Sequence, residues 1–418
     1  MEVKRDQYLN KLIRRKHNGM IKVVTGLRRC GKSYLLFELF YRSLRESGVP
    51  DDHIIKIALD DRANIKYRNP DALYEHLRET IHDTDMYYIL LDEVQLVNEF
   101  EDVLNSMLHI KNADTFVTGS NAKFLSKDII TEFRGRGDQV HMYPLSFSEF
   151  MSAFEGSEEE GWQHYMTYGG MPYIIQCVHH EQKVSYLTDL FSETYIKDVV
   201  SRNHIKNPDC LNDLLNIIAS SIGSLTNPTK LANTFKTVKH VGIASNTIKE
   251  YLDFLSDSFI IEKADRYDVK GKRYIETPAK YYFTDIGLRN ARLGFRQNEE
   301  THIMENIIYN ELRIRDYSVD VGVVNISEPN EKGNYVRKQT EVDFVCNFAS
   351  SRYYIQSALN VSSAEKMEQE ARSLRKIDDS FKKIIVVKDP IIPWRTEDGI
   401  LIVGIRQFLM NPRGLEEL

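Results

Sequence analysis

The chain has 418 residues, of which 42% are hydrophobic and 28% charged, a composition typical of globular proteins and not of disordered or fibrous ones. This length allows about two to four domains with separate cores. The 55 Lys and Arg residues against 61 Asp and Glu residues give a net charge of −6, so binding to DNA would require locally clustered positive charge.

The amino terminus, residues 1–19, has charged residues but no apolar core of a signal peptide. Apolar runs such as YYILL and KIIVV have the length of strands and are far too short to span a membrane. We therefore expect a soluble cytoplasmic protein without a membrane partner. The cysteines are far apart in the sequence, which argues against a structural zinc site or a disulfide framework. They are Cys30, Cys177, Cys210 and Cys346.

Residues 20–146 alternate short apolar or β-branched runs with helical patterns, which predicts an α/β fold with a mostly parallel sheet covered by helices. The predicted strands are IKVVTG, HIIKIALD, YYILLDEV, TFVTGS and QVHMYPL. The predicted helices between them are SYLLFELFYRSL, DALYEHLRETI and EFEDVLNSMLHI.

The segment GLRRCGKS lies between the first predicted strand and a helix, and it fits the pattern G-x-x-x-x-G-K-[ST] in full. The backbone N–H groups of such a loop wrap phosphates, helped by the amino end of the helix. Lys32 is expected to reach the β and γ phosphates, and Ser33 to bind Mg²⁺. The candidate nucleotide-binding residues are Gly26, Leu27, Arg28, Arg29, Cys30, Gly31, Lys32, Ser33 and Tyr34.

The segment YYILLDEVQ predicts the second half of this site, because an apolar strand ends there in Asp92 and Glu93. Asp92 can complete the Mg²⁺ shell together with Ser33, and Glu93 can activate the attacking water. Strands that end in surface acids are common, but the phosphate-binding loop upstream favours the catalytic interpretation.

Two further segments are each open to two interpretations. Ser120 and Asn121 follow the strand TFVTG, where polar side chains can sense the γ-phosphate or orient water, or can form an ordinary turn. Arg134 and Arg136 lie close behind, where an arginine can stabilise charge on the nucleotide of a neighbouring subunit, or can be a basic residue of a surface turn.

The second half of the chain begins with helical patterns. Residues 147–205 are nearly all helical, and residues 206–298 contain three short helices followed by a hairpin, the order of a winged helix-turn-helix. The segment IASNTIKEYL would approach a groove of DNA, and the basic turn of the hairpin would meet phosphates. The candidate DNA-binding residues are Asn246, Thr247, Lys249, Lys270, Lys272 and Arg273.

The motifs GLRRCGKS, LLDEVQ, TGSNAKFLS, FRGR–PLSFSEF and YGGMP together resemble the bacterial and archaeal AAA-type ATPases with a C-terminal nuclease-like domain of unknown function. The resemblance covers nearly the whole chain. It implies an AAA+ core at 1–146, a helical lid at 147–205, a winged helix-turn-helix at 206–298 and a restriction-endonuclease-like PD-(D/E)xK fold at 299–418. In related clades the motif at 169–172 lies close to the nucleotide, whereas the residues alone are equally consistent with a turn that ends a helix.

PD-(D/E)xK nucleases hold Mg²⁺ with carboxylates, and a lysine positions or activates water. Here the acid-x-lysine position reads Gln-Ser-Ala at 356–358, and neither a neutral amide nor alanine replaces the missing groups. We expect the fold to persist and nuclease activity to be lost. The alternative is a pair of unrelated strands with scattered acids. The candidate residues of this degenerate site are Glu305, Glu341, Asp343 and Gln356.

These features favour an AAA+ protein that uses ATP and Mg²⁺, binds DNA, assembles into an oligomer or ring, and couples ATP turnover to DNA remodelling or translocation. The alternative is a slow nucleotide switch, in which the ATP state gates assembly with a protein partner. In that case the winged helix would be a packing module.

Overall fold

The computed structural model describes residues 3–119, 135–296, 299–329, 335–411 and 415–416, and the chain divides into two compact units. The N-terminal unit comprises Glu2–Pro144 and Asp257–Phe259, and the C-terminal unit comprises Leu145–Ser256 and Ile260–Leu418. The N-terminal unit thus ends close to the boundary expected at residue 146, whereas the three domains expected after it lie within one unit. Within the described ranges, no helix has both the length and the apolarity needed to cross a bilayer.

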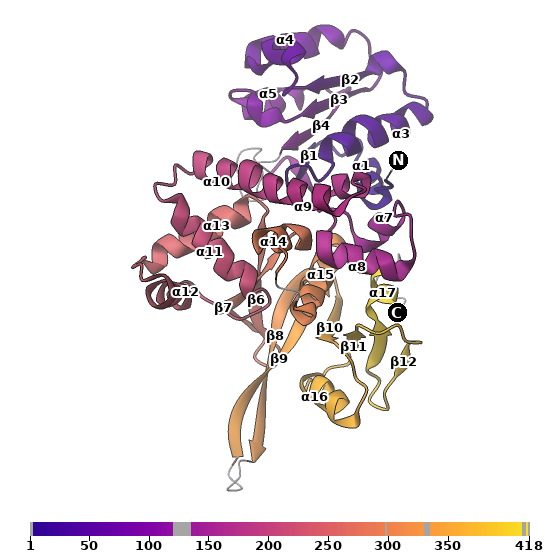
Figure 1. Ribbon diagram of the computed structural model, residues 1–418. Helices are drawn as coiled ribbons and strands as arrows, with labels where there is room; N and C mark the ends of the chain where they lie inside the picture. Colours follow the sequence, from indigo (N-terminus) through magenta and orange to yellow (C-terminus); the bar gives the residue numbers. More distant parts are fainter. Residues whose placement is uncertain (1–2, 120–134, 297–298, 330–334, 412–414, 417–418) are drawn as a thin grey trace. The chain divides into compact units, whose positions relative to one another are not determined.

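The N-terminal unit contains a parallel sheet of five strands in the order β2-β3-β4-β1-β5 (Figure 1). The strands are β1 (Ile21–Gly26), β2 (Ile54–Ala58), β3 (Tyr87–Asp92), β4 (Ala113–Gly119) and β5 (Gly137–Met142). Each of these five strands overlaps a strand predicted from the sequence, so this part of the prediction is confirmed. β1 and β3 are buried along their whole length, as their unbroken apolar runs require in a sheet that is covered on both faces.

Helices cover both faces of this sheet. On one face, α4 (Pro70–Thr80) and α5 (Phe100–Met107) share a hydrophobic core with side chains of β1 and β3. On the other face, the ring of Phe40 lies 4.5 Å from that of Phe116 in β4. The other helices in the described residues of this unit are α1 (Asp6–Arg14), α2 (Lys32–Tyr34), the π-helical η1 (Leu35–Phe40), α3 (Tyr41–Glu46), and the 3-10 helices η2 (Asp51–His53), η3 (Arg62–Arg68) and η4 (Val94–Leu96).

The C-terminal unit begins with helices whose starts are encoded locally. Ser146 and Ser157 form capping boxes with the glutamates three residues later, and Asn207 and Asn227 cap helices that begin with proline. The helices in this first part of the unit, including the four capped ones, are α7 (Phe147–Met151), α8 (Glu158–Tyr168), η6 (Pro172–Gln176), α9 (His180–Asp189), η7 (Leu190–Ile196), α10 (Lys197–Arg202), α11 (Pro208–Ser220), α12 (Pro228–Thr234), η8 (Phe235–Lys239) and α13 (Ser245–Asp257).

The rest of this unit is built around a mixed sheet of eight strands in the order β12-β13-β11-β10-β9-β8-β6-β7. The strands are β6 (Ile261–Asp268), β7 (Arg273–Phe283), β8 (Ser318–Pro329), β9 (Tyr335–Phe348), β10 (Ser351–Ala358), β11 (Lys382–Val387), β12 (Trp394–Arg395) and β13 (Leu401–Gly404). The hairpin β6–β7 was expected to be the wing of a winged helix-turn-helix, and in the structure β6 also pairs in parallel with β8. The boundary expected at residue 298 therefore runs through one sheet.

Two helices cover opposite faces of the eight-stranded sheet. The ring of Phe344 in β9 faces Tyr309 of α15 (Glu300–Ile314), at 6.4 Å between ring centroids. The next residue, Val345, packs in a core with Ala371 and Leu374 of α16 (Ala364–Arg375). The remaining helices of the described segments are α14 (Ile286–Arg292) and α17 (Ile405–Met410).

Candidate functional site

The phosphate-binding loop follows β1 directly, and its geometry explains its glycines. Gly26 has φ of +140°, and a Cβ atom at this position would lie 2.1 Å from the carbonyl oxygen of Met142. Gly31, with φ of +102°, is the N-cap of the helix that starts at Lys32. A side chain would be strained at either position. The sequence therefore folds this segment as a tight loop that leads into the amino end of a helix, as the motif predicts.

Lys32 is only 4% exposed, and its ammonium group donates hydrogen bonds to the carbonyl oxygens of Gly26 and Leu27, both at 3.1 Å. The lysine is thus held inside the loop by neutral acceptors. A phosphate oxygen is a stronger partner for an ammonium group than a carbonyl oxygen, because the hydrogen bond is then charged on both sides. Cys30 is fully buried, and its thiol faces the carbonyl oxygen of Met142 at 3.5 Å.

Asp92 ends β3, and the neighbouring strand β4 supplies the residue that holds it. The hydroxyl of Thr118 donates a hydrogen bond to the Asp92 carboxylate, and the same hydroxyl accepts the N–H of Glu93 at 3.0 Å. Burial raises the pKa of Asp92, and hydrogen bonds from the Thr118 and Ser33 hydroxyls oppose this shift. Thr118 therefore ties both acids to the strand that lies between them and the phosphate-binding loop.

Glu93 adopts a left-handed conformation, with φ of +54°, directly after β3. Such a conformation costs a non-glycine residue about 1–3 kcal/mol, and residues of this kind cluster at functional sites. The side-chain amide of Gln95 donates a hydrogen bond to the Glu93 carboxylate. The left-handed turn and the bond from Gln95 together fix the orientation of the glutamate.

The oxygen atoms of Ser33 and Asp92 are suitable ligands for Mg²⁺. The Ser33 hydroxyl is near enough to the Asp92 carboxylate to oppose the rise in its pKa, so the two oxygens lie near each other beside the loop. Mg²⁺ prefers oxygen ligands and is commonly held by one or two protein groups together with phosphates and water. The residues present therefore fit the ion that the sequence predicts.

Of the other residues predicted for this site, Ser120, Asn121 and Arg134 lie outside the described residues. Arg136 is exposed, and its carbonyl oxygen accepts the N–H of Ile21, the first residue of β1. The loop follows the last residue of this six-residue strand, roughly 17–20 Å away at about 3.3 Å per residue. Arg136 therefore lies too far from the nucleotide site of its own chain to act there, and it is either a residue that acts in a neighbouring subunit or a basic residue of a surface turn.

In the C-terminal unit, part of the predicted DNA-binding set lines one surface hollow of about 700 Å³. Asn246 and Lys249 of α13 line it together with Lys230 of α12 and Thr277 of β7, and Thr247 is next to them in the sequence. All its lining side chains except that of Pro228 are polar or basic, so the hollow is suited to a hydrated, anionic ligand.

The basic residues at the hairpin turn have acidic neighbours. Lys270 lies 3.6 Å from Asp378, and Arg273 lies 3.7 Å from Asp268. Lys272, at the turn itself, is exposed and has φ of +50°. These residues remain accessible, but they lie at the edge of the eight-stranded sheet and not on a free wing.

The predicted degenerate nuclease site is occupied by a lysine from an unexpected strand. Lys280 of β7 is 4% exposed, and its ammonium group lies 2.9 Å from Glu305, 2.5 Å from Glu341 and 3.6 Å from Asp343. We call these four residues the acid cluster. The hydroxyl of Tyr282 also donates to Glu305, at 2.6 Å.

The pKa values of the acid cluster reflect competition between burial and charge. Burial alone would lower the pKa of Lys280, but the surrounding carboxylates raise it. Burial raises the pKa of Glu305 to about 7, although the lysine opposes this shift. Gly223, from the connection between α11 and α12, approaches Glu305 so closely that a Cβ atom there would lie 3.0 Å from the carboxylate.

Gln356, the remaining residue of the predicted degenerate site, bonds Glu370 and the backbone of Asp343 rather than Lys280. Its side-chain amide donates to Glu370 of α16, and its carbonyl oxygen accepts the backbone N–H of Asp343, both at 3.4 Å. The backbone N–H of Ser357 donates to the Asp343 carboxylate at 2.9 Å. Glu370 is a further acid near this site that the sequence motif did not identify, and burial raises its pKa.

The motif at 169–172 forms the turn that one of the two interpretations predicts. Gly169 ends α8 with φ of +70°, and the N–H of Gly170 donates to the carboxylate of Asp285 at 2.7 Å. Asp285 also caps α14 by accepting the N–H of Leu288 at 3.0 Å. Burial raises the pKa of Asp285 to about 6, although these N–H groups oppose the shift.

Sequence reasoning did not identify Thr118, Lys280 or Asp285. Thr118 could have been found, because it is the last polar residue of the strand that precedes Ser120 and Asn121. Asp285 could have been found as an N-cap three residues before Leu288, but its bond to Gly170 lies 115 residues away, and Lys280 carries no local signal because its partner Glu305 lies 25 residues away.

Comparisons with known proteins agree with this geometry. Residues 18–151 match the AAA domain family, and residues 159–299 match a domain of unknown function (DUF8612). Among solved structures, the Aeropyrum pernix ORC1 protein in complex with DNA is 11% identical, covers 70% of this chain and 93% of its own, and gives a TM-score of 0.33. AMPPCP-bound DnaA from Aquifex aeolicus is 13% identical, and the match covers 60% of this chain and 86% of that chain with a TM-score of 0.32. These scores carry no functional conclusion.

Two uncharacterized proteins match over most of their length. One from Methanocaldococcus jannaschii is 29% identical over 392 residues, which are 88% of this chain and 82% of that protein. One from Haemophilus influenzae is 31% identical over 417 residues, which are 98% of this chain and 99% of that protein. The chain belongs to the same family as this Haemophilus influenzae protein and contains an AAA domain with a parallel-sheet AAA+ core.

Proposed function

We propose that this protein binds and hydrolyses ATP with Mg²⁺ at the loop of residues 26–34, Asp92 and Glu93. The observation that carries this proposal is the convergence of three elements. The loop places Lys32 and Ser33 at a helix start, and Thr118 holds Asp92 and Glu93 opposite them. Lys32 would bind the phosphates, Ser33 and Asp92 would hold Mg²⁺, and Glu93 would accept a proton from the attacking water.

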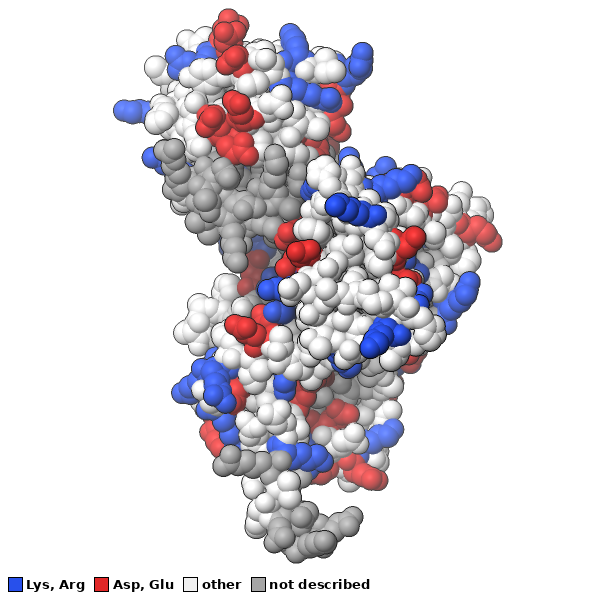
Figure 2. Space-filling view, turned by 90° about the vertical axis from the view of Figure 1, so that its left-hand side faces the viewer, with Lys and Arg blue, Asp and Glu red and all other residues white. Residues whose placement is uncertain are grey.

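DNA is the proposed partner, and ATP turnover is proposed to drive its remodelling or translocation. The hollow beside α13 supports this part, because Asn246 and Lys249 both line it. On the face that Figure 2 shows, Lys and Arg are interspersed with Asp and Glu and do not gather in one patch. With a net charge of −6, binding would depend on a few positioned contacts, each of which would add about one unit to the salt dependence of the affinity.

An oligomer or ring is proposed because the position of Arg136 excludes a role in its own nucleotide site. Mixing Arg136→Ala subunits with Lys32→Ala subunits should restore part of the ATPase activity, since a mixed interface pairs an intact loop with an intact arginine. Arg15→Ala is the matched control, because Arg15 is a partly exposed arginine of the same unit that pairs with Asp138. An active monomer over a wide concentration range would contradict this role.

We also propose that residues 299–418 have a nuclease-like fold without nuclease activity. Lys280, Glu305 and Asp343 are each at least nine-tenths buried, so a scissile phosphate has no direct access to them. Purified protein should leave duplex, single-stranded and branched DNA intact in Mg²⁺ or Mn²⁺. Cleavage that disappears in Asp343→Ala would overturn this assignment.

The second candidate function is a nucleotide switch that gates assembly with a protein partner. The observation that favours it is the pairing of β6 with β8, because a hairpin built into a sheet serves packing better than it serves DNA binding. The two candidates differ in whether DNA changes the rate of ATP hydrolysis.

The deciding experiment measures ATP hydrolysis by the full chain alone and with linear duplex, single-stranded or branched DNA. The DNA proposal expects stimulation, and Lys249→Ala should reduce it and flatten the salt dependence of binding by about one unit of slope. Lys236→Ala is the matched control, because Lys236 is exposed on the neighbouring η8 and does not line the hollow. A rate of ATP hydrolysis that DNA does not change, together with nucleotide-dependent assembly with a protein, would favour the switch.

A further inference from the structure

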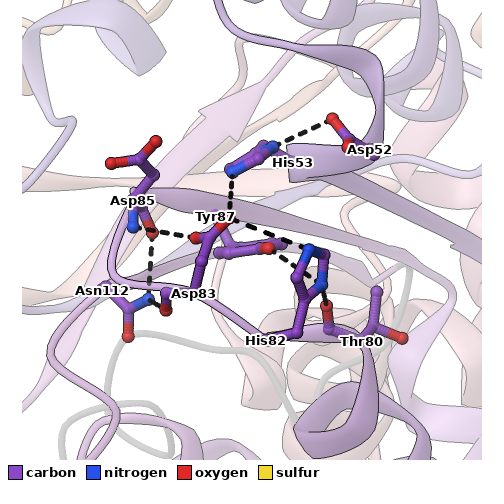
Figure 3. Close-up of polar contacts among 8 residues, drawn as sticks. All are labelled: Asp52, His53, Thr80, His82, Asp83, Asp85, Tyr87 and Asn112. Carbon is purple, nitrogen blue, oxygen red and sulfur yellow. Dashed lines mark hydrogen bonds and ion pairs between the residues drawn. The ribbon is translucent and has the colours of Figure 1, made fainter.

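The amino ends of β2 and β3 carry a cluster of side chains that the nucleotide site does not use. Asp52 and His53 come from η2, immediately before β2, and His82, Asp83 and Asp85 come from the connection between α4 and β3 (Figure 3). The phosphate-binding loop lies at the carboxyl end of β1. Because the strands of this sheet are parallel, the cluster lies at their amino ends, opposite the carboxyl ends where the nucleotide would bind.

His53 is fixed in one orientation. Its side chain is 8% exposed, and its ring stacks on that of Tyr87, with centroids 4.4 Å apart and an angle of 21° between the planes. Its Nδ1 atom lies 3.0 Å from a carboxylate oxygen of Asp52. With Nδ1–H donating to Asp52, the neutral ring presents a lone pair on Nε2.

That Nε2 atom faces carboxylates. It is buried and, among the residues that the structure describes, has no hydrogen-bond partner. A carboxylate oxygen of Asp83 approaches it to 3.2 Å. One ligand atom from each of His53, Asp83 and Asp85 lies within 4.8 Å of the other two. A lone pair and two carboxylates repel one another unless a proton or a metal cation lies between them.

The Asp83 carboxylate and the backbone of Asp83 and Asp85 are held in place before any ligand binds. The Asp83 side chain accepts the N–H of Asp85 at 2.9 Å, and the Asn112 amide donates to the carbonyl oxygens of both residues, at 3.0 and 2.9 Å. His82 adds a further nitrogen, with Nε2 3.8 Å from Asp83 and Nδ1 bonded to the carbonyl oxygen of Thr80 at 2.9 Å. A prearranged loop of this kind lowers the entropy cost of binding.

We propose that His53, Asp83 and Asp85 bind a divalent transition-metal ion such as Zn²⁺, with His82 as an additional ligand. A set of imidazole and carboxylate donors suits Zn²⁺, whereas Mg²⁺ prefers oxygen ligands alone. The contact between Asp52 and His53 is the arrangement that a metal-bound histidine usually has, since a carboxylate on the second ring nitrogen fixes the tautomer. The ion would join the amino ends of β2 and β3, independently of the nucleotide.

The test is equilibrium dialysis of the full chain against Zn²⁺ without nucleotide, after removal of metal by a chelator. We expect a site in which Asp85→Asn weakens Zn²⁺ binding at least about tenfold and Asp52→Asn about 10- to 100-fold. Both side chains are exposed, so neither substitution should impair folding. Glu75→Gln is the matched control, because Glu75 is an exposed acid on the nearby α4, and it should leave the affinity unchanged.

Co²⁺ offers a second readout, because its visible absorption reports the ligand set. The Co²⁺ spectrum of the wild type should change in Asp85→Asn and not in Glu75→Gln. Zn²⁺ affinity and Co²⁺ spectra that are the same in the wild type and Asp85→Asn would overturn the proposal. So would a wild type that binds neither ion, which would identify His53 as a protonated ring paired with Asp52 and Asp83.

Discussion

In the nucleotide site the buried Lys32 donates to two backbone carbonyl oxygens, whereas in the acid cluster the buried Lys280 meets three carboxylates. Both places combine a lysine with acids at or near the ends of strands. In the first, the partners of the positive charge among the described residues are neutral, so it can bind a phosphate. In the second, the positive charge is already neutralised within the chain.

This difference teaches that the same residue types can form a binding site or a structural contact, depending on where the counter-charge comes from. A buried ion pair is costly to break, because removal of one partner leaves the other charge buried and uncompensated. Lys280 therefore joins β7 to α15 and β9, whereas Lys32 can exchange its carbonyl partners for a phosphate. Four predictions test this contrast, from the largest expected effect to the smallest.

Lys32→Ala should abolish tight ATP binding, because the phosphates lose their cationic contact. Lys56→Ala, which removes an exposed lysine of β2 in the same unit, should bind ATP like the wild type. Calorimetric titration of both variants with Mg-ATP measures the effect. Wild-type affinity in Lys32→Ala would remove this lysine from the proposed site.

Lys280→Met should destabilise the C-terminal unit by about 3–5 kcal/mol, because it leaves buried carboxylates without a cation. Mn²⁺ should recover part of this loss by taking the place of the ammonium group. Lys263→Met is the matched control, since Lys263 is a half-exposed lysine of β6 paired with Asp265, and it should cost about 0–1 kcal/mol. Thermal unfolding with and without Mn²⁺ gives the comparison, and equal stability of the two variants would contradict it.

Asp285→Asn should flatten the dependence of stability on pH. Burial raises the pKa of Asp285 to about 6 in the folded chain, so the protonated form is favoured there. Stability therefore falls as pH rises from about 4, the value in unfolded chains, through about 6, by at most about 3 kcal/mol. Asparagine is as good a helix cap and does not titrate.

The readout for Asp285→Asn is the change in the midpoint of thermal unfolding between pH 4.5 and 7. Glu305 and Asp320 also have raised pKa values, but they titrate in both proteins, so the difference between the two proteins isolates Asp285. An equal fall in both proteins would show that Asp285 is not protonated in the folded unit.

Thr118→Val should slow ATP hydrolysis about tenfold and leave ATP binding nearly unchanged. The variant keeps the shape of the side chain but removes the hydroxyl that bonds Asp92 and Glu93, and a hydrogen bond to a charged group contributes about 1.5–3 kcal/mol. Thr118→Ser retains the hydroxyl and should retain the rate. Equal rates in the two variants would show that the hydroxyl does not position the acids.

The two regions also differ in how well the sequence predicts them. The strands of the N-terminal unit and the loop at 26–33 were predictable, because an apolar run, two glycines and a lysine determine that geometry locally. The pairing of β6 with β8 was not, since it joins segments more than 50 residues apart. An irregularity in the pairing of β8 with β9 between Asp320 and Gly322 adds a further difficulty. Glu341 and Asp343, two residues apart on β9, still share the face toward Lys280, but alternation does not carry past this irregularity to the residues that follow.

The most direct test of the account measures ATP binding and ATP hydrolysis on the same samples of the wild type and Glu93→Gln. The account predicts that the wild type does both in a Mg²⁺-dependent way. Glu93→Gln should bind ATP with similar affinity but hydrolyse it at least about 100-fold more slowly, because a neutral amide cannot accept the proton of the attacking water. Hydrolysis by Glu93→Gln at the wild-type rate would contradict the proposed chemistry of the site.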